Sequence, residues 1–209
     1  MLNGLKRLLS HHSIYVGLQR AVGADRLRYR CLAELDLGPG ETVLDLGCGP
    51  AYYLGRLPRD TRYFGFDTST RYIEHARKQW GDGPQFRDEL FTEEHADALP
   101  PINAIMLLGL LHHLSDEQSR QLLTLAGRVL APGGRVISVD TCFEPTQGRI
   151  SRWMSANDRG EHVRTPEAFA ALAREVFKDI DGEVLNTTTR IPTSHWMMRM
   201  STPVTTFGS

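Results

Sequence analysis

The chain has 209 residues, a length that suits one α/β domain and leaves little room for a second. Its formal net charge of -1 provides no global basic field to recruit nucleic acid or a membrane surface. The three cysteines lie far apart and fit a reducing, cytoplasmic compartment rather than a disulfide framework, and the longest apolar run, Ile105–Leu111, is far shorter than the roughly 20 residues of a membrane span.

The first half of the chain predicts helices separated by strands. Residues 1–37 carry apolar residues at helical spacing and predict an N-terminal helical cap, which ends at Gly38–Gly40. The elements predicted next are a strand at Thr42–Leu46, a short helix from Tyr52 to Leu57, a strand at Tyr63–Phe66, a helix capped by Thr68 or Ser69, and a short strand at Gln85–Arg87.

The second half continues this alternation. Ile105–Leu110 is a continuous apolar run, as expected of a central parallel strand that is buried on both faces. A capping box at Ser115 and Gln118 opens the next helix, and Pro166 opens a later one. The remaining strands are predicted at Arg135–Asp140, at about 183–189 and at His195–Met200. Such alternation predicts an α/β fold that binds ligands at the carboxyl ends of its parallel strands.

The turn after the first strand carries the strongest functional signal. Gly47 and Gly49 allow a tight turn and a close approach of the backbone to a ligand. Asp67 lies at the spacing at which an acidic residue bonds ribose hydroxyls. Tyr52 stands where a nicotinamide-binding loop needs its third glycine, and its side chain would crowd a pyrophosphate. Asp45 adds a negative charge that suits a cationic amine, so the turn favours an adenosine cofactor with an amino-acid tail.

Several stretches resemble, in order and spacing, the motifs of the class I S-adenosylmethionine-dependent methyltransferases, in particular the small stand-alone, type 11-like members. They are Val43–Ala51, Tyr63–Thr68, Phe86–Asp88, Leu107–Leu114 and Val129–Asp140. The resemblance implies a Rossmann-like doubly wound sheet of seven strands, mostly parallel with an antiparallel last strand, within a single domain over residues 1–200. The tail 201–209 is expected to be flexible, as chain ends commonly are.

The resemblance also implies S-adenosylmethionine as the cofactor and S-adenosylhomocysteine as its product. Asp45, Gly47 and Gly49 would line the methionine part, and Asp67 would hold both ribose hydroxyls. Asp88, with the backbone of Glu89, would bond the adenine amino group, with Asp97 as a rival. The full predicted cofactor set is Asp45, Gly47, Cys48, Gly49, Asp67, Thr68, Asp88, Glu89, Leu108, His113 and Tyr15. No metal site is predicted.

The acceptor side is predicted from two regions. His112 and His113 follow the fourth strand, where a histidine could deprotonate an acceptor hydroxyl or where both could simply cap the strand end and the next helix. Residues 141–166 form an insertion that either covers the acceptor, as the resemblance implies, or packs on the sheet as an amphipathic segment. Its arginines suit an anionic group. The predicted acceptor-binding residues are Arg149, Arg152, Trp153, Arg159 and, on a late strand, His195.

The leading hypothesis is a methyltransferase that acts on an oxygen of a small molecule, such as a secondary metabolite or a sugar-like compound. N- or C-methylation is an alternative, because cofactor motifs do not reveal the acceptor atom. A nicotinamide-dependent oxidoreductase and a non-catalytic binding module are further alternatives, disfavoured by Tyr52 and by the intact glycine turn with its acidic residues. No nucleic-acid or membrane partner is predicted, and a monomer or homodimer is expected.

Overall fold

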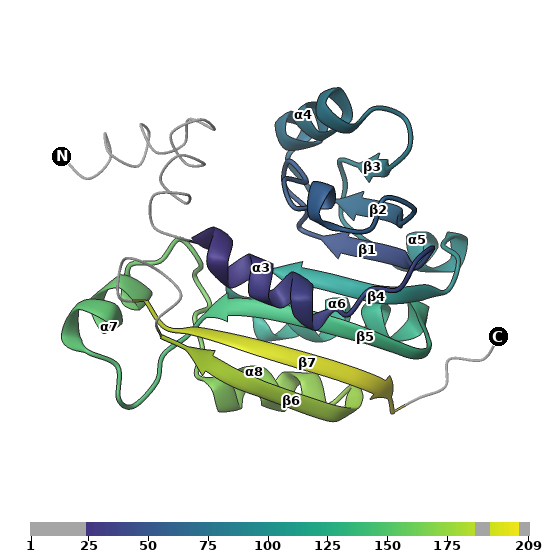
Figure 1. The fold of residues 1–209 in the computed structure, drawn as a ribbon. Coiled ribbons are helices and arrows are strands. Elements are labelled where there is room, and N and C mark those ends of the chain that lie inside the picture. Colours follow the sequence, from purple (N-terminus) through teal and green to yellow (C-terminus); the bar gives the residue numbers. More distant parts are fainter. Residues whose placement is uncertain (1–23, 187–192, 205–209) are drawn as a thin grey trace.

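A seven-stranded sheet in the order β3-β2-β1-β4-β5-β7-β6 forms the middle of the molecule (Figure 1). The computed structural model describes residues 24–186 and 193–204. The first five strands run parallel: β1 (Thr42–Leu46), β2 (Arg62–Phe66), β3 (Gln85–Arg87), β4 (Ile102–Leu108) and β5 (Leu130–Thr141). β7 (His195–Pro203) is antiparallel to β5 and to β6 (Phe177–Leu185). The predicted Rossmann-like α/β sheet with an antiparallel last strand is confirmed.

Helices cover both faces of this sheet, as the strand–helix alternation predicts (Figure 1). One face packs against α3 (Ala24–Glu34) and α4 (Thr70–Trp80). The other face packs against α5 (Glu93–Ala98), α6 (Asp116–Val129) and α8 (Pro166–Arg174). Within the described residues, no helix is both long and apolar enough to cross a membrane.

β4 shows why the sequence of a central parallel strand is a continuous apolar run. Ile105 and Leu107 belong to the core cluster on one face, whereas Ala104 and Met106 belong to the cluster on the other. All four side chains are fully buried, so neither face of the strand tolerates the polar residue that an alternating pattern would contain. The strand ends at Gly109, whose φ of 81° turns the chain sharply toward the site.

The helix starts follow the expected cap chemistry. Ser69 accepts a hydrogen bond from the amide of Tyr72 and caps α4. Ser115 and Gln118 form the predicted reciprocal capping box of α6, at 3.2 and 2.9 Å. Thr165 caps α8, with proline directly after it. These caps fix the helix N-termini near the carboxyl ends of the strands, where the site lies.

Some expected boundaries differ from those observed. The helix expected at Tyr52–Leu57 is only a 3-10 turn, Leu54–Arg56, because proline at position 58 ends the segment before an α-helix can form. The strand expected at about 183–189 begins earlier, as β6, whose exposed Lys178, Asp179 and Asp181 are typical of a charged edge strand and hide it from an apolar pattern; residues 187–189 lie outside the described residues. β7 continues past Met200 to Pro203, so the first residues of the expected tail are paired with β6.

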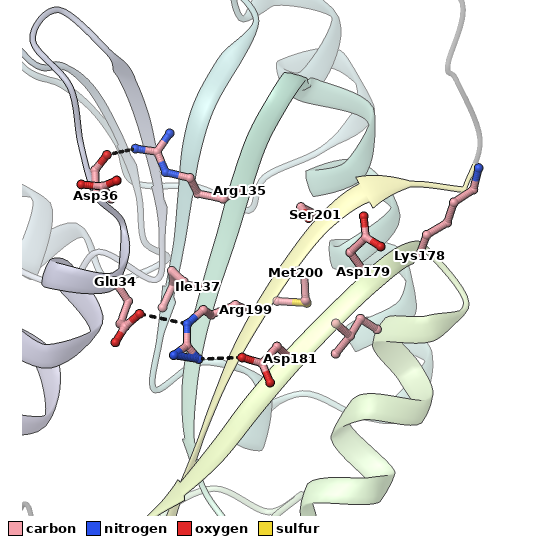
Figure 2. Close-up of a pocket in the computed structure, with 11 residues that line it drawn as sticks. Glu34, Asp36, Arg135, Ile137, Lys178, Asp179, Asp181, Arg199, Met200 and Ser201 are labelled. Atoms are coloured by element: carbon pink, nitrogen blue, oxygen red, sulfur yellow. Dashed lines mark hydrogen bonds and ion pairs between the residues drawn. The ribbon is translucent and has the colours of Figure 1, made fainter.

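An open groove of about 700 Å³ lies at the amino-terminal end of the parallel strands, away from the glycine turn (Figure 2). Arg199 of β7 reaches Glu34 of α3 at 3.0 Å and Asp181 of β6 at 3.3 Å. Arg135 of β5 bonds the backbone oxygen of Asp36 at 2.7 Å. These contacts join α3 to the antiparallel edge of the sheet, and they engage Arg135 and Arg199 of the groove within the fold.

Candidate active site

The glycine turn after β1 is held against the ends of two neighbouring strands. Gly47 and Gly49 have φ values of 73° and 52°, a backbone conformation that residues other than glycine rarely adopt. The amides of Gly47 and Cys48 both donate to the carbonyl oxygen of Phe66 at the end of β2, at 2.8 and 3.0 Å. A Cβ at Gly47 would lie 3.1 Å from the side chain of Leu110. The backbone conformation favours glycine at both positions, and at Gly47 the space beside Leu110 favours it as well.

Asp67 follows β2 and is oriented by backbone amides on both sides. Its Oδ2 accepts a hydrogen bond from the amide of Gly49 at 2.9 Å, and its Oδ1 accepts one from the amide of Ser69 at 2.8 Å. Each carboxylate oxygen has a second lone pair, because an ionised carboxylate offers about four acceptor sites. The side chain lines a cavity and can accept two neighbouring hydroxyls there.

Asp45 is a buried carboxyl group one residue before the end of β1. It accepts a hydrogen bond from the Tyr63 hydroxyl at 2.6 Å. Burial raises the pKa of Asp45 to about 7, the Tyr63 hydrogen bond opposes that rise, and the charge of Asp67 adds to it. A cationic ligand group beside Asp45 would stabilise its ionised form.

A cavity of about 300 Å³ joins these groups at the carboxyl ends of β1, β2 and β4. It is lined by Arg28, Asp45, Gly47, Cys48, Gly49, Pro50, Tyr52, Tyr53, Asp67, Tyr72, Leu108, Gly109, Leu110, His113 and Arg159. Since β1 lies between β2 and β4 in the sheet, Asp67 and His113 flank the glycine turn on opposite sides. The described residues contain no cluster of three side chains placed to hold a metal ion.

His112 is clamped between two carboxylates. Its Nδ1 lies 2.8 Å from Asp140 at the end of β5, and its Nε2 lies 3.4 Å from Asp158. The backbone amide of His112 also donates to Asp140, at 3.1 Å. Burial alone would lower the pKa of His112, but the hydrogen bond and charge of Asp140, followed by the charge of Asp158, outweigh it and raise the pKa. A ring with both nitrogens engaged by carboxylates is a poor general base.

His113 differs from its neighbour although the two rings lie only 4.2 Å apart. Its side chain lines the cavity, and the 3-10 turn Leu111–His113 places it there while it directs His112 toward β5. Burial and then the charge of His112 lower the pKa of His113. A neutral imidazole in the cavity wall can accept a proton, so His113 is the better candidate base of the two.

Comparison with known proteins identifies the domain. Residues 43–134 match a family model described as a methyltransferase domain. The structure of the N-methyltransferase NodS from Bradyrhizobium japonicum WM9 with S-adenosyl-l-homocysteine superposes with a TM-score of 0.67 at 17% identity, over 95% of this chain and 96% of that one. At that identity the likeness shows the fold.

Residues 43–134 thus resemble a methyltransferase domain, and the chain has the fold of an N-methyltransferase.

Curated relatives match parts of this methyltransferase domain. An uncharacterized 37.1 kDa protein in transposon TN4556 of Streptomyces fradiae is 38% identical over 51% of this chain and 32% of its own length. The 27-O-demethylrifamycin SV methyltransferase of Amycolatopsis mediterranei is 29% identical over 58% of this chain and 46% of its own. The mouse probable tRNA methyltransferase 9B is 30% identical over 56% and 25%. The chain thus spans less than half of the length of each of these three relatives.

The cavity is lined by most, but not all, of the cofactor residues expected from sequence. Asp45, Gly47, Cys48, Gly49, Asp67, Leu108 and His113 line it. Thr68, Asp88 and Glu89 are not among the lining residues; Asp88 bonds Arg77 at 3.3 Å and Glu89 lies 3.1 Å from His95. The rival Asp97 pairs with Arg128. Tyr15 lies outside the described residues.

The expected acceptor residues separate into one that lines the cavity and several that do not. Arg159 lines it. Arg149 borders a separate hollow beside α7 (Arg149–Ala156), and Arg152 lies over the ring of Phe143. Trp153 is 66% exposed, because α7 turns serines rather than apolar residues toward the sheet.

His195 lies on β7, outside the lining of the cavity. Burial, then the charges of Arg28 and His112, lower its pKa to about 4. Its buried Nδ1 has no hydrogen-bond partner within residues 24–186 and 193–204.

Sequence reasoning missed Arg28 and Asp158. Arg28 enters the cavity from α3 and lies 3.3 Å from the Tyr53 hydroxyl. Asp158 contacts His112 across 46 positions of chain. Neither residue sits in a recognisable motif, so only the packing of α3 and of the insertion on the sheet reveals them.

Proposed function

We propose that this protein transfers a methyl group from S-adenosylmethionine to an oxygen atom of a small-molecule acceptor. The observation that carries the proposal is a single cavity that joins the glycine turn and Asp67 to the neutral His113. The rifamycin-modifying relative, whose printed name is that of a methyltransferase for the 27-O position, supports an oxygen acceptor.

The lining residues fit the cofactor in charge and in hydrogen bonding. Asp67 keeps acceptor capacity for the two ribose hydroxyls. Asp45 suits the ammonium group of the methionine tail, and Arg28 is a cation in the same cavity wall that suits its carboxylate. When bound, S-adenosylmethionine supplies an electrophilic methyl group whose carbon–sulfur bond breaks, leaving a neutral thioether.

We propose that His113 acts as the general base that accepts the proton of the acceptor hydroxyl. The hydroxyl proton would pass to a ring nitrogen of His113 as the acceptor oxygen takes up the methyl group. General-base assistance of this kind contributes roughly 10²–10⁴-fold. Alignment of acceptor and donor in the cavity supplies more, up to about 7–11 kcal/mol in well-oriented systems.

Other acceptors remain alternatives within the same chemistry. A nitrogen acceptor is supported by the N-methyltransferase with the same fold. The relatives named as probable tRNA methyltransferases raise a nucleic-acid acceptor, but the net charge of -1 gives this chain no general attraction for phosphates. Tyr52 lines the cavity, where it would crowd the pyrophosphate of a nicotinamide cofactor. A cytoplasmic monomer or homodimer stays a prediction.

Calorimetry tests the cofactor half of the proposal. Wild-type protein is expected to bind S-adenosylhomocysteine and not NADH. Asp67→Ala should weaken that binding by at least about 10-fold, since charge-assisted hydrogen bonds to two hydroxyls are lost. Asp82→Ala removes the same charge from an exposed turn and should leave binding unchanged. No binding of S-adenosylhomocysteine by wild-type protein would refute the proposal.

Mass spectrometry tests the acceptor half. Pools of phenols, sugars, amines, carboxylic acids and short RNAs are incubated with S-adenosylmethionine and searched for the gain of one methyl group. For a hydroxyl acceptor, His113→Gln should lower kcat by roughly 10²–10⁴-fold without changing the affinity for S-adenosylhomocysteine. Methylation confined to RNA, or an unchanged kcat in His113→Gln, would contradict this part.

A further inference from the structure

The 3-10 turn Leu111–His113 places the candidate base in the cavity wall, yet it makes few hydrogen bonds of its own. The amide of His113 donates to the carbonyl oxygen of Leu110 at 3.0 Å, and the amide of Leu114 donates to that of Leu111 at 3.2 Å. Short 3-10 segments have poorer hydrogen-bond geometry than α-helices, and buried carbonyl oxygens need a partner. The position of His113 therefore depends on what else contacts this turn.

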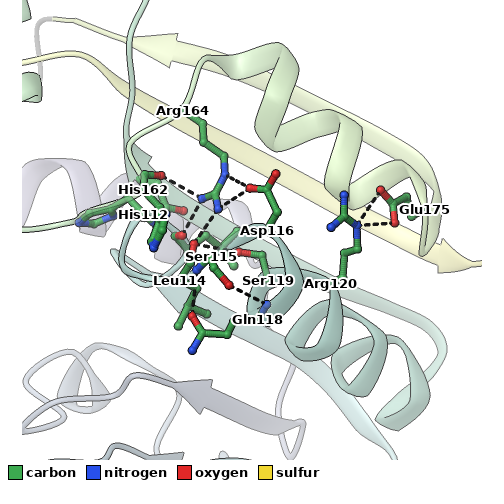
Figure 3. A network of polar contacts seen from close by, with 12 residues as sticks. His112, Leu114, Ser115, Asp116, Gln118, Ser119, Arg120, His162, Arg164 and Glu175 are labelled. Atoms are coloured by element: carbon green, nitrogen blue, oxygen red, sulfur yellow. Dashed lines mark hydrogen bonds and ion pairs between the residues drawn. The ribbon is translucent and has the colours of Figure 1, made fainter.

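Arg164, near the end of the insertion, holds the turn from both sides of His113 (Figure 3). Its Nη1 donates to the carbonyl oxygen of Leu111 at 3.0 Å, and its Nη2 donates to that of Leu114 at 2.6 Å. Both hydrogen bonds come from one planar guanidinium, whose donors have a fixed spacing. The side chain is only 9% exposed, so its neighbours fix its geometry.

The residues just before Arg164 pack on the middle of the same turn. The amide of His162 donates to the carbonyl oxygen of His112 at 3.0 Å. A Cβ at Gly160 would clash with the His112 ring and lie 2.5 Å from its carbonyl oxygen, so the two segments are in close contact there. The carbonyl oxygens of residues 111, 112 and 114 thus all accept hydrogen bonds from residues 162–164.

The backbone of Arg164 is itself fixed to the chain that leaves β5. Its carbonyl oxygen accepts a hydrogen bond from the amide of Phe143 at 2.9 Å, and Arg164 forms an isolated parallel bridge with Cys142. On β5, Asp140 accepts a hydrogen bond from the amide of His112 at 3.1 Å. The end of β5 therefore holds the turn twice, directly through Asp140 and indirectly through Arg164.

The guanidinium of Arg164 bonds mainly to backbone oxygens rather than to acidic groups. Besides Leu111 and Leu114, it donates to the carbonyl oxygen of His162 at 2.9 Å. It also pairs with Asp116 at 2.8 Å, but the side chain of Asp116 is 62% exposed, and exposed ion pairs contribute little to stability. Removing a charge from water is unfavourable unless its new partners compensate. Fixing the turn is a role that accounts for a buried guanidinium at this place.

We propose that Arg164 is a positioning residue for the methyl transfer, which holds the turn so that the His113 ring stays at the acceptor. This inference rests on the proposed function, in which His113 removes the acceptor proton. A general base has to lie within hydrogen-bond reach of that proton, so a displaced turn would slow the reaction. Arg164 is not among the described residues that line the cavity, and it acts through the backbone of the turn.

NMR titration of the histidine ring signals in the full chain tests this role without an acceptor. Burial, and then the charge of His112, lower the pKa of His113 in the intact turn. In Arg164→Gln the turn loses its guanidinium and should loosen, so the pKa of His113 should rise toward the ordinary value of about 6.5. The affinity for S-adenosylhomocysteine should not change. A phenol or sugar that the wild-type protein methylates should be methylated roughly 10²-fold more slowly by Arg164→Gln.

Two further variants separate positioning from a loss of stability. Arg164 also lies over the ring of Phe169, at 5.4 Å, so Arg164→Gln weakens the packing of α8 as well. Gly127→Ala disturbs the fold at the other end of α6, where a Cβ would lie 2.9 Å from Val176, and it should leave the pKa of His113 unchanged. Arg164→Lys keeps the charge but has no planar fork to bond both carbonyls, so it should raise the pKa of His113 as Arg164→Gln does.

Three results would overturn the inference: an unchanged pKa of His113 in a folded Arg164 variant, the same rise in Gly127→Ala, or a weaker affinity of Arg164→Gln for S-adenosylhomocysteine. Failure of both Arg164 variants to fold would also overturn it, because Arg164 would then be needed for stability. If wild-type protein does not bind S-adenosylhomocysteine, the proposed function fails, whereas the titration of His113 in the unliganded protein still shows whether Arg164 fixes the turn.

Discussion

Replacing His112 by alanine should destabilise the protein more than replacing His113. Asp140 is 1% exposed, and Nδ1 of His112 lies 2.8 Å from its carboxylate. Removal of one member of a buried ion pair costs about 3–5 kcal/mol, because the remaining charge is left in the interior. The backbone amide of residue 112 still donates to Asp140, which places the expected loss near the lower limit, at about 3 kcal/mol.

Thermal unfolding measures this loss directly. For a domain of this size, about 3 kcal/mol corresponds to a decrease in Tm of roughly 6–12 °C. His113→Ala removes the ring of an exposed residue that has no carboxylate at hydrogen-bond distance in the described structure, and should cost at most about 1 kcal/mol. A double variant, His112→Ala with Asp140→Ala, should be less destabilised than the sum of the single variants, because the unpaired charge is gone. Additive effects, or a loss below about 1 kcal/mol for His112→Ala, would show that the clamp is not a stabilising pair.

The contact between His112 and Asp140 also makes the stability of the fold depend on pH. The pKa of His112 is raised in the folded state, so its contribution to stability is complete below the unfolded value of about 6.5. It is lost as the pH rises through the raised folded value. The difference in unfolding free energy between wild type and His112→Ala should therefore narrow in alkaline solution, and a difference that widens instead would contradict the assignment.

Three further predictions concern the cavity and its walls. Because burial raises the pKa of Asp45 to about 7, S-adenosylhomocysteine should bind more tightly as the pH rises from about 5.5 to 7.5, and Asp45→Asn should flatten that calorimetric profile. Gly160→Ala should lower acceptor turnover while cofactor affinity holds, whereas Gly148→Ala, where an added Cβ meets nothing within 4 Å, should leave both unchanged. Burial raises the pKa of the Cys31 and Cys142 thiols to about 12, so both should react with Ellman's reagent far more slowly in native than in unfolded protein.

The residues that line the cavity at the ends of β1 and β2 could be predicted from sequence because their determinants are local. Gly47, Gly49 and Asp67 follow directly after strands whose apolar runs mark their ends, and parallel strands bring those ends to one edge. β1 and β3 have the predicted bounds for the same reason. Asp45 is readable because a carboxyl group inside an apolar strand is exceptional.

The acceptor half is not readable because its contacts join distant segments. Adjacent histidines at 112 and 113 look equivalent in sequence, and only the 3-10 turn and the position of Asp140 give them different environments. α7 misleads in another way: Ser151 and Ser155 are buried and bond Gln147, whereas Ile150 and Trp153 are exposed. A helix that turns its polar side inward cannot be placed by an apolar stripe.

The acidic and the basic residues of the cavity wall come from different parts of the fold. Acidic groups, Asp45 and Asp67, come from the strands that form the cofactor side, while the cations Arg28 and Arg159 come from segments laid over the sheet. Asp140 and Asp158 hold the imidazole of His112 within the wall. Burial, and then the charge of His112, lower the pKa of His113, whereas Asp158 and Asp140 oppose that shift. The proposed difference in role between the two histidines therefore rests on position: both nitrogens of His112 lie beside carboxylates, whereas His113 lines the cavity.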